Sequence, residues 1–99
     1  MFTQRLSRQD ALSLLRHCFE EGIVQYHSHF HQRCVDRKVD PMGAQHVLRK
    51  GTIFDEPEFE VRFQQWRYKV EGKDPDGGML KVVFTFLSSN QVLVLTVLT

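Results

Sequence analysis

The apolar residues of this chain change their spacing at about residue 52, and this change constrains the fold more than any other feature. Before it they recur every three or four positions, as on the buried face of a helix, and after it they alternate, as in strands. A chain of 99 residues has room for one hydrophobic core. We therefore predict a single α+β domain, residues 1–99, with about three N-terminal helices packed on a C-terminal antiparallel sheet of about four strands.

The helical half carries start and stop signals for each helix. Ser7 and Asp40 are N-cap residues, and Pro41 follows at the first helical position. Gly22 is expected to end the first helix in the left-handed conformation, and Gly51 ends the third. The predicted helices cover about residues 7–21, 29–38 and 41–50.

The second half reads as strands joined by turns. Two phases of alternation meet at a bulge or turn near Gln64 and Gln65, and the stretches "EGKDPDGG" and "SSNQ" have the composition of hairpin connections. The last two strands are apolar on both faces, so they are central in the sheet or one face meets another chain, and a dimer is one reading. The predicted strands cover about residues 52–63, 66–72, 79–87 and 91–98.

Charge and composition limit the partners of this protein. A formal net charge of +1 gives no general attraction to nucleic acid or to an anionic membrane, so any RNA contact must be local. The N-terminus lacks the apolar run of a signal peptide and "VLVLTVLT" is too short to span a bilayer, so we expect a cytoplasmic protein with no membrane partner. Cys18 and Cys34 lie on apolar helix faces and are expected to be reduced core thiols.

The stretch "YHSHFHQRCVDRK", residues 26–38, holds three of the five histidines. On a helical wheel it leaves His29, Arg33 and Arg37 at positions i, i+4 and i+8 along one edge. Further along the chain, strand alternation puts Arg67 and Lys69 on one face. The buried stripe of this second helix is predicted to be Phe30, Cys34 and Val35.

These residue types suit RNA cleavage without a metal or cofactor. Such cleavage needs a base for the 2′-hydroxyl, an acid for the leaving oxygen and cations around the phosphorane. His29 would be the base or acid, and guanidinium groups hold phosphate in a bidentate way. The predicted catalytic residues are His29, Arg33 and Arg67, and the predicted substrate-binding residues are Arg37, Lys69 and Tyr68, the last as a platform that stacks a base.

Other readings of the same residues remain open at this point, and one is that Arg33 is a structural clamp onto a carbonyl at the sheet edge. The helix edge could be a solvated face with ion pairs to Asp36 or Glu60. Trp66 and Tyr68 alternate with charged residues, as core or dimer contacts do. In an extended segment, His27, His29 and His31 would share a face and could bind zinc, with Cys34 close by.

The run "HSHFHQRCVDRKVDPMGAQHVLRKGTI", followed by "RYKVEG", "DGG", "LKVVFTF" and "LTV", resembles the small bacterial domain of unknown function 4258. That family has Ser-x-His, an Arg four residues later, a second Arg four further on, and a helix ending in Leu-x-x-Gly. Here Ser28 directly precedes His29, and Phe30 stands where a small residue is expected. The resemblance implies a fold of the RelE and barnase ribonuclease type, in which some relatives are toxin components.

Two hypotheses of function follow. The first is a small RNA-acting domain of the RelE-like toxin type, with RNA as substrate and an antitoxin as partner. The second is a non-catalytic interaction module that forms a homodimer or docks a partner through its apolar sheet. The C-terminal stretch "VLVLTVLT" motivates the second, because an unpaired apolar strand invites edge pairing.

Overall fold

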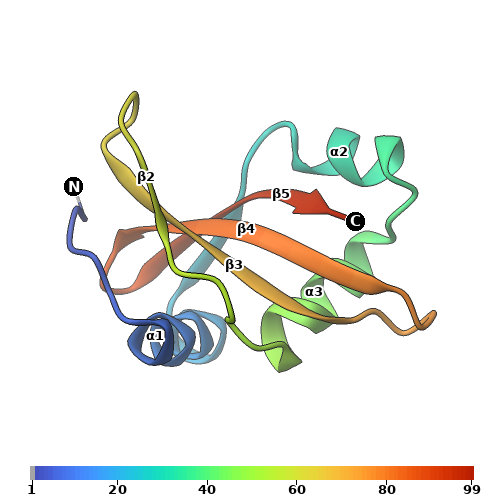
Figure 1. The fold of residues 1–99 in the computed structure, drawn as a ribbon, viewed down its shortest axis with the longest axis horizontal. Helices are drawn as coiled ribbons and strands as arrows, with labels where there is room; N and C mark the ends of the chain where they lie inside the picture. Colours follow the sequence, from blue (N-terminus) through green and yellow to red (C-terminus); the bar gives the residue numbers. More distant parts are fainter. Residues whose placement is uncertain (1) are drawn as a thin grey trace.

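The computed structural model describes residues 2–99, in which three helices accompany one five-stranded sheet (Figure 1). The predicted α+β class is therefore confirmed. The strands lie in the order β1-β5-β4-β3-β2. In chain order the elements are α1 (Arg8–Glu21), β1 (Ile23–Tyr26), α2 (Phe30–Asp36), α3 (Pro41–Lys50), β2 (Glu58–Glu60), β3 (Gln65–Lys73), β4 (Met79–Ser88) and β5 (Gln91–Leu98).

Strand β1 is the main departure from the predicted topology. The segment "IVQY" lies outside all the predicted helices and strands, but it pairs in parallel with β5, with Val24 opposite Val92. The sheet is therefore mixed and has five strands in residues 2–99, whereas an antiparallel sheet of about four strands was predicted; the pairings among β2, β3, β4 and β5 are antiparallel, as predicted. Four residues are too few for a period to be read, and their partner strand is far away in the sequence.

The predicted strand over residues 52–63 is also wrong in extent. Only the three residues of β2 pair with β3, and Thr52 forms an isolated bridge to Glu71. Residues 61–64 turn the chain, and Gln64 has a φ of 51°, so the turn predicted near this residue is confirmed. Phe59, Val61 and Phe63, which alternate in the sequence, are all exposed.

The helix caps follow the sequence signals. Ser7 Oγ accepts a hydrogen bond from Asp10 N at 3.1 Å, and Asp40 Oδ1 accepts one from Met42 N at 2.9 Å. Gly22 does not adopt the predicted left-handed conformation, because its φ is −111°. Glycine is required at this position because a Cβ would lie 2.4 Å from the carbonyl oxygen of Asn90.

The hydrophobic core lies between the sheet and helices α1 and α3, which are below the sheet in Figure 1. Cys18 and Cys34 are buried free thiols, as predicted, and burial raises the pKa of both. Val35 is 71% exposed, so its place in the predicted buried stripe is wrong. The stripe of this short helix is narrower than the wheel suggested and consists of Phe30 and Cys34.

Strand β5 is central, as its apolar faces predicted. It pairs with β1 along residues 91–94 and with β4 along most of its length. Helix α2 lies beside the C-terminal half of β5, above the strands in Figure 1, and its buried residues Phe30 and Cys34 belong to the same core. We call the side of the sheet that faces away from α1 and α3 the outer face; Arg67, Lys69 and Thr96 lie on it. No helix within residues 2–99 has the length and apolar character needed to cross a membrane.

Candidate functional site

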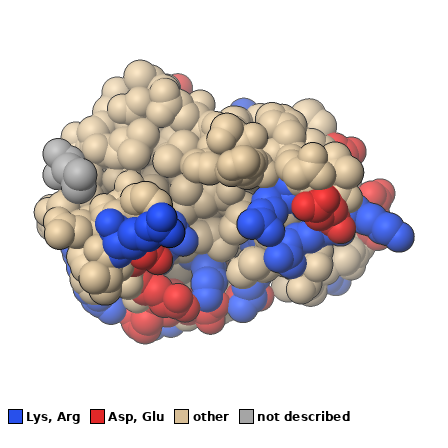
Figure 2. Space-filling view, turned by 90° about the horizontal axis from the view of Figure 1, so that it is seen from above, with Lys and Arg blue, Asp and Glu red and all other residues tan. Residues whose placement is uncertain are grey.

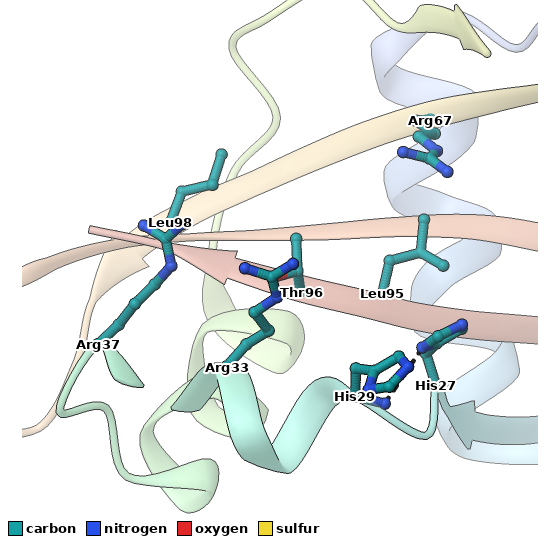
Figure 3. A pocket seen from close by; sticks show the side chains of 8 residues that line it. All are labelled: His27, His29, Arg33, Arg37, Arg67, Leu95, Thr96 and Leu98. Carbon is teal, nitrogen blue, oxygen red and sulfur yellow. Dashed lines mark hydrogen bonds between the residues drawn. The ribbon is translucent and has the colours of Figure 1, made fainter. Parts of the chain in front are cut away.

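A pocket of about 340 Å³ lies on the outer face, between α2 and strands β3 and β5. Figure 3 shows its side chains from close by. Four of the six predicted site residues come together here, and the apolar part of the lining comes from β5. The lining residues are His27, His29, Arg33, Arg37, Arg67, Leu95, Thr96 and Leu98.

The local fold explains how the cationic side chains reach this pocket. His27 directly follows β1, and its backbone N–H donates to Val94 O at 2.8 Å, which fixes it against β5. His29 is the N-cap residue of α2, and Arg33 follows one helical turn later. Arg37 is the C-cap residue, so the edge predicted from the i+4 spacing survives although the helix is shorter than expected. Both arginines extend from α2 over β5 in Figure 3.

The two histidines of the pocket are adjacent. Their ring centroids are 5.3 Å apart, and the backbone N–H of His29 donates to His27 Nδ1 at 3.2 Å. A ring whose Nδ1 accepts a hydrogen bond carries its proton on Nε2 when neutral, so His27 can offer an N–H donor to a ligand. The helical wheel did not assign His27 to this site because it precedes the helix. The β-branched run "IVQY" is the signal that could have placed it at the end of a strand.

The three arginines of the pocket have no partners among residues 2–99. Neither an ion pair nor a side-chain hydrogen bond involves Arg33, Arg37 or Arg67 there, and no carboxylate lines the pocket. Arg67 Nε is buried and also lacks a partner. A buried donor without a partner is costly, and phosphate or carboxylate would satisfy it. The pocket is therefore suited to bind an anion.

The ion pairs proposed for a purely solvated helix edge do not form. Asp36 accepts a hydrogen bond from Gln32 at 2.8 Å, and Glu60 accepts one from the backbone of Arg62 at 2.9 Å. Figure 2 shows the side of the molecule that carries α2, where Lys and Arg side chains form separate groups with uncharged surface between them. The cationic character is thus local, as the small net charge required.

Two predicted substrate-binding residues are not brought to the pocket. Lys69 is on the outer face with Arg67, but its Nζ pairs with Glu58 Oε1 at 2.9 Å. Tyr68 points to the opposite face, is 1% exposed, and its hydroxyl accepts a hydrogen bond from Leu6 N at 3.0 Å. Strand alternation separates the two, and the core reading of Tyr68 is the one that the geometry favours.

The histidines do not form a metal site. Within residues 2–99, no three His, Cys, Asp or Glu side chains converge as metal ligands. The ring of His31 packs edge-on against Phe30, with centroids 5.5 Å apart, and Cys34 is buried in the core. The zinc hypothesis required an extended segment, in which His27, His29 and His31 share one face. The segment instead turns into α2.

Comparison with known proteins identifies a matching family. A sequence model of the family described as "Domain of unknown function (DUF4258)" matches residues 26–99. The matched segment contains every residue that lines the pocket and leaves out α1 and most of β1. No curated protein and no solved structure shows significant similarity to the chain.

Proposed function

The chain belongs to the family called domain of unknown function 4258, and we propose that its pocket is the active site of a metal-independent ribonuclease. The observation that carries the proposal is the combination of side chains. Three guanidinium groups without ion-pair partners in residues 2–99 and two imidazoles line one pocket that has no carboxylate. A phosphodiester supplies the anion that the arginines lack, and imidazoles transfer protons near neutral pH.

In the proposed reaction, His29 takes the proton of the 2′-hydroxyl, and the resulting oxygen attacks the adjacent phosphorus. A 2′,3′-cyclic phosphate forms while the bond to the 5′-oxygen breaks. The departing oxygen takes a proton from water and leaves as a hydroxyl group, while His27 keeps its Nε2 proton and donates a hydrogen bond to the phosphate. Arg33 and Arg67 hold the non-bridging oxygens, whose negative charge grows in the transition state, and Arg37 binds a neighbouring phosphate.

A RelE-like assignment is part of the same proposal. Strands β2 to β5 are antiparallel, and two helices pack on one of their faces, which fits the layout expected of that ribonuclease type. Under this assignment an antitoxin would cover the arginines of the pocket. The alternative function is a non-catalytic module that forms a homodimer or docks a partner through its apolar sheet; edge pairing by the last strand is not its route, because β5 has a partner strand on each side.

The test is cleavage of a mixed-sequence RNA by the purified protein in EDTA. We expect His29→Ala to lower the rate by about 10²–10⁴-fold, the range of a general acid or base, and Arg33→Ala to lower it as well. Arg62→Ala is the matched control, because Arg62 is an exposed arginine outside the pocket. The products should end in 2′,3′-cyclic phosphate.

Thermal melting of each variant shows whether the fold is retained. RNA that stays intact at high protein concentration would contradict the proposal. Equal rates for wild type and His29→Ala would also contradict it, because the cleavage would then come from another source.

A further inference from the structure

A second pocket adjoins the candidate active site and shares Leu98 with it. Its volume is about 310 Å³, and it lies at the end of the outer face where β4 begins and β5 ends. We call it the Met79 pocket. Its lining residues are Glu71, Met79, Leu80, Lys81, Leu98 and Thr99.

The Met79 pocket is apolar, and its charges are paired with each other or with Asp55. Lys81 Nζ lies 3.1 Å from Asp55 Oδ2 and 3.8 Å from Glu71 Oε1. The hydrogen bond with Asp55, helped by the charge of Glu71, raises the pKa of Lys81 and keeps it cationic. One lysine beside two carboxylates leaves a net charge of −1, so this pocket does not attract phosphate, in contrast to the arginine-lined pocket beside it.

Packing of the core does not explain the exposure of Met79 in this pocket. Its side chain is 57% exposed, although its neighbour Leu80 is 1% exposed. A thioether is flexible and polarisable and packs well against aromatic rings. An exposed methionine beside Leu98 therefore offers a surface for a flat, uncharged group.

We propose that the Met79 pocket holds a nucleobase of the RNA, next to the phosphate that binds at Arg37, the arginine beside Leu98 in Figure 3; this inference rests on the proposed function. In a nucleotide the charged phosphate and the uncharged base are separated by one sugar. The two pockets show a similar division, with unpaired arginines on one side of Leu98 and, on the other, Met79, Leu80 and a lysine that is paired with carboxylates. Glu71, Lys81 and Thr99 at the rim offer hydrogen bonds to the edge of the base, so this pocket would set sequence preference.

The experiment measures binding of short single-stranded DNA, which retains the phosphates but lacks the 2′-hydroxyl needed for cleavage. Fluorescence anisotropy compares a tetranucleotide with an abasic strand of the same length. We expect wild type to bind the strand with bases about tenfold more tightly, the size of one stacked base. Met79→Ala should remove most of this preference and leave abasic binding unchanged. Met42→Ala is the control, since Met42 is an exposed methionine that lines neither pocket.

The outcomes separate this inference from the proposed function. Suppose that Arg33→Ala weakens binding of both strands. If wild type then shows no preference for the strand with bases, or if Met79→Ala retains that preference, the nucleobase pocket is wrong and the phosphate site stands. If Arg33→Ala leaves the abasic strand's affinity unchanged, the proposed function fails. Binding of neither strand by wild type overturns both.

Discussion

At the scale of single residues, two arginines show how the chain balances stability against a binding site. Within residues 2–99, Arg16 and Arg67 are the two whose Nε is buried without a partner. Arg16 still stabilises the fold, because its Nη2 donates to Gly51 O at 2.7 Å and satisfies the end of α3. Arg67 makes no such contact in the described chain, so its burial is a cost that a bound anion would offset.

We predict opposite effects of the same substitution at these two positions. Arg67→Met should leave the free energy of unfolding unchanged or raise it by up to about 1 kcal/mol, because an unpartnered donor is replaced by an apolar group. Arg16→Met should lower it by about 1–3 kcal/mol through loss of a charge-assisted hydrogen bond. Urea denaturation measures both, and phosphate affinity should fall only in Arg67→Met. Equal destabilisation by the two changes would mean that Arg67 is a structural residue.

At the scale of elements, the junction between α1 and β1 depends on a close approach. Ile23 N donates to Asn90 O at 2.9 Å, which places the turn between β4 and β5 directly over Gly22. The restriction at Gly22 is steric, since its φ of −111° suits any residue.

We expect Gly22→Ala to lower the free energy of unfolding by about 1–3 kcal/mol, because the added methyl group collides with a backbone oxygen. Gly78→Ala is the control: a Cβ there has only Asp74 Oδ2 nearby, at 3.7 Å, so the change should stay within about 0.5 kcal/mol. Thermal melting compares the two. A Gly22→Ala variant that melts with wild type would show that the turn can move away without cost.

The elements that could be predicted from sequence are those specified by local signals. Ser7 and Asp40 marked the starts of α1 and α3, and the spacing of Arg33 and Arg37 placed both on one helix edge. Strand β1 and the reach of His27 into the pocket depend on pairing with β5, a distant partner that the β-branched run "IVQY" suggests but does not identify. Alternation correctly separated Arg67 from Tyr68, but it could not tell which face of the sheet the helices α1 and α3 would cover.

At the scale of the whole molecule, a net charge of +1 and an RNA site are compatible because acids and bases are unevenly placed. Four cations, Arg5, Arg8, Lys69 and Lys81, are paired with carboxylates, whereas the pocket arginines have no such partners in residues 2–99. A short strand bound in the pocket would therefore contact few cations.

The salt dependence of binding to a single strand should reflect the small number of cations in the pocket. With three arginines on phosphates, the slope of log K against log salt should be about −2 for a single strand, and Arg37→Ala should reduce its magnitude by about 0.7. Anisotropy titrations at several salt concentrations measure the slope. A much steeper slope would place the strand on cations outside the pocket, and a slope near zero would remove the phosphates from the interaction.

The parallel pairing of β1 with β5 also determines when the pocket can exist during synthesis. His27 is held by Val94 O, and Leu95, Thr96 and Leu98 form the pocket floor, so the histidines are translated long before the strand that positions them. While the chain is being made from its N-terminus, residues 23–29 have no partner until β5 has left the ribosome. The candidate site therefore cannot form on the nascent chain before β5 is available to pair with β1.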